Sequence, residues 1–156
     1  MPVYETILVG TDGSETAQLA VDRAADLAAR FGARLVMVSA FHPAPETRLE
    51  AERRGAPADI VWAINGKEEV DQVLSGARHR AEGRGAGDVV TMAVQGSASD
   101  VLLDIAEKVD ASVIVVGSVG LTGAKRFLMG SVPSRVTHYA EVDVLVVRTD
   151  RVPPST

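Results

Sequence analysis

The 156-residue chain contains no cysteine, one tryptophan and few aromatic residues in all. Without cysteine it can form no disulfide bond, no thiolate nucleophile and no cysteine-ligated metal site, although this absence leaves the compartment open. Positive charge is not in excess either, because 16 Lys and Arg residues stand against 21 Asp and Glu residues. With a net charge of −5, we expect no general affinity for nucleic acid or for an anionic membrane.

Long apolar runs are absent as well. No run approaches the roughly 20 residues that a membrane-spanning helix needs. The N-terminal sequence MPVYETILVGTDGS does not combine a basic stretch with a long apolar stretch, as a signal peptide would. We therefore expect a soluble, cytoplasmic protein that does not enter a membrane. The length and the 46% apolar content are typical of one globular domain with a sizeable core.

Short apolar runs alternate with segments of helical periodicity along the chain. Continuous apolar runs are typical of strands buried on both faces of a parallel sheet. They occur at residues 6–10, 35–38, 89–94, 113–116 and 144–147. Helical patterns follow Ser14 as far as Gly32, then cover residues 69–84, 97–110 and 133–140. This alternation predicts a three-layer α/β sandwich around a five-stranded parallel sheet.

The stretch from residue 113 to residue 132 combines a strand, a glycine-rich loop and the start of a helix. Its small residues are Gly117, Gly120, Gly130 and Ser131, with the spacing G-x2-G-x9-G-S. Glycines let a backbone approach an anion, and the free amides at a helix start can donate hydrogen bonds to it. The order of these parts therefore predicts a phosphate-binding loop.

A second candidate lies directly after the first strand, in the turn Thr11-Asp12-Gly13-Ser14. The carboxyl ends of strands are where doubly wound sheets bind their ligands. Asp12 could therefore contact a ligand, or hold Mg²⁺ together with phosphate oxygens. Aspartate also shapes turns by accepting a hydrogen bond from the backbone two residues on. From its position alone, both interpretations of Asp12 stay open.

These features together resemble the universal stress protein family, in its ATP-binding branch. The resemblance rests on the G-x2-G-x9-G-S spacing, on GTDGS after the first strand, and on GSASDVLLDIAEKVDASVIVVGS, and it spans residues 3–149. It implies a single domain over residues 1–149 with a Rossmann-like fold of the adenine nucleotide alpha hydrolase-like type, with sheet order 3-2-1-4-5. In that order the Asp12 turn and the Gly117 loop meet at the topological switch point.

The resemblance also implies a function, an adenine-nucleotide-binding regulatory protein of the stress response, with ATP as the ligand. Amides around Gly130 and Ser131 would hold phosphate. Asp12 matches an aspartate that the family carries near the nucleotide, and it could bind an Mg²⁺ ion held by the nucleotide. The positions that match the family's nucleotide site are Thr11, Asp12, Ala40, Val116, Gly117, Gly120, Gly130, Ser131 and Val132.

Two positions depart from the family pattern. Val119 stands where relatives often have histidine or arginine, and Pro133 where many have serine, threonine or alanine. Both changes remove a polar group, so cyclic AMP or AMP remains an alternative to ATP, and some family members bind cyclic AMP.

The chain has no G-x-x-x-x-G-K-[ST] pattern and no evident catalytic group. We therefore favour a binding protein over a slow ATPase or autophosphorylating protein, and over a pure dimerisation module, because the glycines are intact.

Three further expectations concern the rest of the chain. Residues 42–68 are irregular, contain three prolines, and follow the second strand, so they could cover the ligand side. Residues 150–156 are expected to fray. The last strand, from Val142 to Arg148, lies at the sheet edge in the expected order and carries no charge in its middle. Such an edge invites pairing with another chain, so we predict a homodimer through this strand.

Overall fold

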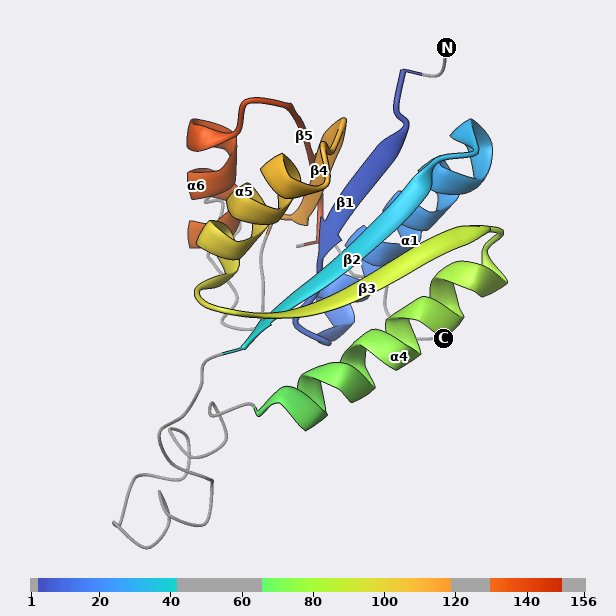
Figure 1. Cartoon of the computed structure of the whole chain (residues 1–156), viewed down its shortest axis with the longest axis horizontal. Helices are drawn as coiled ribbons and strands as arrows, with labels where there is room; N and C mark the ends of the chain where they lie inside the picture. The colour runs from blue at the N-terminus through green and yellow to red at the C-terminus, as the bar shows by residue number, and fades with distance from the viewer. Residues whose placement is uncertain (1–2, 42–65, 119–129, 150–156) are drawn as a thin grey trace, which may run out of the picture.

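The computed structural model describes residues 3–41, 66–118 and 130–149. Over these residues the chain forms a five-stranded parallel sheet in the order β3-β2-β1-β4-β5. Helices α1 and α4 pack against one face of the sheet, and helices α5 and α6 against the other (Figure 1). The predicted three-layer sandwich and the predicted strand order are both confirmed.

All five predicted strands are present, and the helices fall between them as expected. The strands are β1 Thr6–Gly10, β2 Arg34–Phe41, β3 Asp88–Gln95, β4 Val113–Gly117 and β5 Asp143–Val147. The helices are α1 Glu15–Phe31, α4 Lys67–Gly83, α5 Ala98–Lys108 and α6 Ser131–Tyr139. Strand β2 runs past its predicted end at residue 38, because Ser39, Ala40 and Phe41 continue the pairing with β3.

The starts of two helices were predicted two residues too late in the chain. Helix α6 begins at Ser131 rather than at residue 133, with Gly130 as its extended N-cap. Pro133 is thus inside the first turn, where an amide has no intrahelical acceptor to lose. Helix α4 begins at Lys67, so Lys67 and Glu68 do not belong to the predicted irregular segment 42–68. The Gly66 amide donates to the Glu69 carboxylate at 2.8 Å, which fixes this helix start. Residues 42–65 and the tail 150–156 lie outside the described residues.

Strands β1 and β4, which are neighbours in the interior of the sheet, bury both of their faces. Ile7, Val9 and Val115 pack with α1 and α4, while Leu8 and Ile114 pack with α5 and α6. Successive strand residues point to opposite faces, which explains why these runs are continuously apolar. Each such side chain contributes about 1.5–3 kcal/mol when it is buried. The central strands therefore give a rigid support to the turns that follow them.

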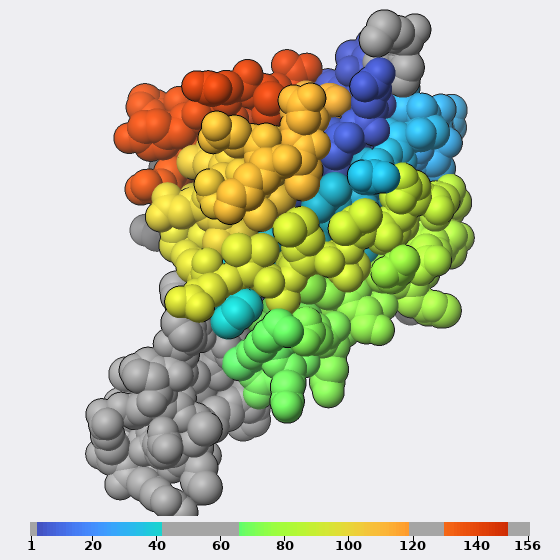
Figure 2. All heavy atoms as spheres, in the orientation of Figure 1, coloured from blue at the N-terminus to red at the C-terminus, as the bar shows by residue number. Residues whose placement is uncertain are grey.

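Each described helix comes after a strand and packs back along the sheet. All four of these helices therefore begin at the edge where the strands end, which we call the carboxyl edge (Figure 1). Figure 2 shows α5 (gold) and α6 (orange-red) adjoining on one face of the molecule. Since a helix N-terminus carries a partial positive charge, this arrangement surrounds the carboxyl edge with four positive ends.

Candidate functional site

The turn after β1 is fixed by hydrogen bonds from its own residues. The Thr11 amide donates to the Val38 carbonyl at 3.0 Å, which extends the pairing with β2 beyond Gly10. Asp12 Oδ1 then accepts from the Ser14 amide at 2.9 Å, and Ser14 Oγ accepts from the Ala17 amide at 3.1 Å. Ser14 is thus the N-cap of α1, and Asp12 shapes the turn that leads into it.

Gly13 joins this turn to helix α4. Its φ is +81°, and a Cβ atom there would lie 2.9 Å from Val73 Cγ2. Only glycine combines that backbone conformation with so close an approach. The Gly13 amide donates to the buried Thr11 hydroxyl at 3.2 Å. The turn is therefore held by β1 on one side and by α4 on the other.

The strand register brings the second candidate segment next to this turn. Val9 pairs with Val115, so the end of β1 lies beside the end of β4. Beyond Gly117, the Ser118 amide donates to the Val147 carbonyl at 2.8 Å, and the Ser118 carbonyl accepts from the Gly130 amide at 2.8 Å. The two ends of the glycine loop are thus adjacent. Gly120 falls within residues 119–129, which lie outside the described residues.

The start of α6 differs from the other described helix starts. Helices α1, α4 and α5 carry Glu15, Glu68 with Glu69, and Asp100 in their first turns. The first turn of α6 has no acidic residue, and its N-cap makes no side-chain hydrogen bond. Since Gly130 gives its amide to Ser118 and Pro133 has none, the remaining donors in this turn are the amides of Ser131 and Val132. This end therefore keeps its partial positive charge for an anion.

The remaining predicted positions have different surroundings. Ala40 is half-buried near the end of β2, and Ser131 is exposed. Val116 is buried in the core beneath α5 and α6, and Val132 packs against that same core cluster. The structure therefore brings the turn after β1, the end of β4 and the α6 N-terminus to one edge, but it directs the Val116 side chain into the core.

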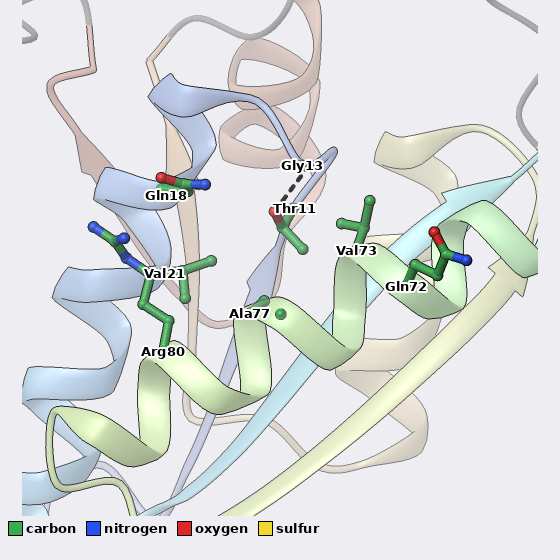
Figure 3. A pocket seen from close by; sticks show the side chains of 9 residues that line it. Thr11, Gly13, Gln18, Val21, Gln72, Val73, Ala77 and Arg80 are labelled. Carbon is green, nitrogen blue, oxygen red and sulfur yellow. Dashed lines mark hydrogen bonds between the residues drawn. The ribbon is translucent and has the colours of Figure 1, made fainter.

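Of two cavities lined by described residues, neither includes the start of α6. One, of about 290 Å³, lies between α1 and α4 and includes Thr11 and Gly13 at one end (Figure 3). Thr11 is the one predicted site residue that lines it. The other, of about 570 Å³, lies where β4 and β5 begin, beside the C-terminus of α6, and is lined by the carboxylates of Asp100, Asp104, Glu107, Asp110 and Glu141. Those charges would repel a phosphate, so electrostatics favour the carboxyl edge for an anionic ligand.

Ser118 is a residue of this region that the sequence pattern did not reveal. Its hydroxyl accepts from the Thr149 amide at 2.9 Å and lies 3.3 Å from the Thr149 hydroxyl. The sequence signal for this residue was a serine directly after Gly117, which ends β4. That signal does not identify the partner, Thr149, because it lies 31 residues further along the chain.

Among the described residues no three His, Asp or Glu side chains are grouped as metal ligands. None of the described helices is long and apolar enough to cross a membrane.

Comparisons with known proteins agree with this arrangement. The family model described as the universal stress protein family matches residues 3–148. A universal stress protein of Mycobacterium tuberculosis is 38% identical over 149 residues, which cover 96% of this chain and 99% of the relative. The crystal structure of a universal stress protein in complex with cAMP is 35% identical, with a TM-score of 0.73 over 94% of this chain and 98% of that one. A universal stress protein of Lactobacillus plantarum is 25% identical, with a TM-score of 0.71 over 93% of this chain and 98% of its own.

Proposed function

The chain belongs to the universal stress protein family, and from this premise we propose that it is a cytoplasmic regulatory protein that binds an adenine nucleotide. The observation that carries the proposal is the α6 N-terminus, where the amides of Ser131 and Val132 lack an acidic neighbour in the first turn. This helix end adjoins the end of β4 through the hydrogen bond between Gly130 and Ser118. Adenine nucleotides carry the phosphate that such an end attracts.

The proposed site extends from this helix end toward the turn after β1. A phosphate group would accept from the Ser131 and Val132 amides and from the Ser131 hydroxyl. The adenosine part would lie along Thr11, Asp12 and Ala40, with Gly117 close to the ribose. Asp12 is exposed at the carboxyl end of β1, so it could reach the ribose or a Mg²⁺ ion on the phosphates. The amides of Ser131 and Val132, together with the Ser131 hydroxyl, suit one phosphate group.

We propose ATP as the ligand because of the glycine spacing, and cyclic AMP is the second candidate. The second candidate is favoured by the similarity to the protein that was solved in complex with cAMP. Calorimetric titration of each nucleotide, with and without Mg²⁺, would separate the two. Mass spectrometry of the small molecule released from purified, denatured protein would identify the ligand that the protein retains from its cell. Incubation with ATP and Mg²⁺, followed by measurement of ADP and of protein mass, would detect slow hydrolysis or autophosphorylation.

The test of the site is Gly130→Val, compared with Gly66→Val. Both glycines are extended N-caps, with φ values of −62° and −80°, so neither needs glycine for its backbone conformation. A valine side chain at residue 130 would stand where the phosphate approaches. We expect Gly130→Val to lose binding of ATP and of cyclic AMP with an unchanged circular dichroism spectrum, while Gly66→Val binds as the wild type does. Unchanged affinity of Gly130→Val for both nucleotides would overturn the proposed site.

A further inference from the structure

Ser118 ties three parts of the molecule together, and each of its polar groups takes part. Its amide donates to the carbonyl of Val147, the last residue of β5, at 2.8 Å. Its carbonyl accepts from the amide of Gly130, the N-cap of α6, at 2.8 Å. Its hydroxyl accepts from the amide of Thr149 at 2.9 Å. One residue thus connects the end of β4, the end of β5 and the start of α6.

These contacts are buried from solvent. The exposed fraction is 6% for Ser118 and 0% for Thr149, and their hydroxyl oxygens lie 3.3 Å apart. A buried polar group that loses its partner costs more free energy than an exposed one, because water does not replace the partner. Removing the Ser118 hydroxyl would therefore take one buried acceptor from the Thr149 amide and weaken the contact between Ser118 and the residues that follow β5. Since that hydroxyl is enclosed with Thr149, it is not a group for contacting a ligand.

The α6 N-terminus is attached to the same residue, Ser118, by a backbone hydrogen bond. Residues 119–129 separate Ser118 from Gly130 in the chain, and the hydrogen bond between Ser118 and Gly130 holds these two residues together. The Gly130 carbonyl accepts from the Ser134 amide at 3.2 Å, so displacing Gly130 would displace the first turn of the helix. The amides of Ser131 and Val132 lie in that turn. A site whose donors are already held in place binds more tightly, because less ordering is needed when the ligand arrives.

We propose that Ser118, together with Thr149, is a positioning residue that sets the affinity of the α6 N-terminus for the nucleotide phosphate without touching the nucleotide. The proposal rests on the proposed function, since it concerns the same site. It adds a residue outside the nucleotide-binding positions and makes the buried contact with the end of β5 a determinant of affinity. When the connection is lost, the helix start occupies its binding position for a smaller fraction of the time, and the apparent affinity falls by that fraction.

The chain offers a matched pair of substitutions. Ser118→Ala removes the hydroxyl that accepts from Thr149 and keeps the backbone groups. The control is Ser112→Ala, since Ser112 directly precedes β4 just as Ser118 directly follows it. Ser112 Oγ accepts from the amides of Glu5 and Thr6 at 3.1 and 3.3 Å. Both serines therefore fasten β4 to a neighbouring part of the sheet, but Ser112 lies at the opposite edge from the candidate site.

The experiment measures affinity, stability and local opening in the same three proteins. Calorimetry with ATP and with cyclic AMP should show the dissociation constant of Ser118→Ala raised about tenfold and that of Ser112→Ala unchanged. Thermal unfolding midpoints should fall in both variants, by about 2–8 °C. Amide hydrogen exchange by NMR should be faster at Gly130 in Ser118→Ala alone.

The outcomes separate this proposal from the proposed function. If the wild type binds a nucleotide and Ser118→Ala binds it equally well, the positioning role is overturned and the function stands. If both variants lose affinity equally, the effect is general destabilisation, and the positioning role is again overturned. A wild type that binds no adenine nucleotide overturns the function and this proposal with it. If Ser118→Ala does not fold, Thr149→Val, which keeps the shape of Thr149 and removes its hydroxyl, must raise the dissociation constant relative to Ser112→Ala.

Discussion

At Asp12, one carboxylate oxygen accepts the Ser14 amide at 2.9 Å, and the side chain is exposed at the carboxyl end of β1. The interpretation of Asp12 as a turn residue is therefore confirmed. This does not exclude a ligand role, because a carboxylate has a second oxygen and four lone-pair directions. The role in the turn needs only an oxygen at Oδ1, whereas binding of Mg²⁺ needs the negative charge. Substitutions can therefore separate the two roles.

We predict that Asp12→Asn weakens nucleotide binding by about 1–3 kcal/mol, the range for losing a charged hydrogen-bond partner. Its amide oxygen can still accept from Ser14, so the free energy of unfolding should stay close to the wild-type value. Asp12→Ala should lose the same affinity and also about 0.5–1.5 kcal/mol of stability. Calorimetry with and without Mg²⁺, together with urea unfolding, tests both variants. If Asp12→Asn binds like the wild type while Asp12→Ala is only less stable, the side chain serves the turn alone.

Single residues also mark the limit of what could be predicted from sequence. Ser14 as an N-cap was predictable, because its partner Ala17 is three residues away. The reason for Gly13 was not, since the side chain that it must accommodate is Val73, from a helix far along the chain. Ser118 was missed for the same reason, because its partner is Thr149. Local hydrogen bonds follow from the sequence pattern, whereas contacts between distant segments need the fold.

Among the helices and strands, the same distinction explains two of the boundaries that were predicted wrongly, the start of α6 and the end of β2. Proline favours the first position of a helix, so Pro133 seemed to mark the start of α6, but the extended Gly130 starts it earlier. For β2, composition indicated an end at residue 38, yet the strand continues for as long as β3 offers partners, up to Phe41 with Gln95. Pairing between strands therefore decides where a strand ends, and composition alone does not show it.

Helices α1 and α4 are joined by a pair of matched ion pairs. Asp22 and Asp26 lie one turn apart on α1, and Arg80 and Arg84 lie one turn apart on α4. Arg80 binds Asp22 and Arg84 binds Asp26 through two nitrogens each, with Nη2 to Oδ2 distances of 2.8 Å in both pairs. Arg84 Nη1 also lies 3.8 Å from Asp22 Oδ2. Gly13, which lies just before α1, closely approaches Val73 of α4. These ion pairs therefore support the turn after β1 from a distance.

The pKa of Asp26 is lowered, chiefly by the hydrogen bond from Arg84. Because the pKa is lower in the folded protein than in the unfolded chain, this pair adds stability at neutral pH. The contribution begins to fall below about pH 4, the ordinary value for aspartate, and is lost as the pH drops through the lowered pKa. Both side chains are more than a third exposed, so the contribution is about 0.5–1 kcal/mol.

We therefore predict that Asp26→Asn lowers the free energy of unfolding by that amount at pH 7, and that its difference from the wild type shrinks as the pH approaches 3. Urea unfolding at several pH values measures this. The control is Asp104→Asn. Asp104 pairs with Lys108 within one exposed helix turn, and this pair should contribute only about 0.3 kcal/mol. A loss at pH 3 as large as at pH 7 would contradict an ionic origin.

On the scale of the whole molecule, the fold was predictable because several independent signals agree. Apolar runs, helical periodicity and glycine stops all indicate strands alternating with helices. The strand order was not contained in these signals and came from the resemblance to the family. The strand order matters for the proposed function, because it brings β1 beside β4 and leaves β3 and β5 at the two edges of the sheet. The candidate ligand site and the predicted dimer surface are both consequences of that order.

The edge position of β5 leads to the last prediction, a homodimer in which this strand pairs with its copy about a two-fold axis. Val147 gives its carbonyl to Ser118, so the backbone groups of Val147 and of Leu145 face β4. By alternation along the strand, the amide of Val146 faces away from β4. An apolar edge with outward amides is open to a second strand, and identical chains close this arrangement by two-fold symmetry.

Proline at residue 146 should therefore break the dimer without breaking the sheet. Val146→Pro removes an outward donor and leaves the pairing of β4 with β5 in place, whereas Leu145→Pro would remove an amide that faces β4 and should destabilise the fold. Val146→Thr keeps the amide and should remain dimeric. Sedimentation equilibrium across a range of concentrations measures the association of each protein. A wild type that is monomeric at tens of micromolar would refute the dimer, and a Val146→Pro variant that stays dimeric would place the interface elsewhere.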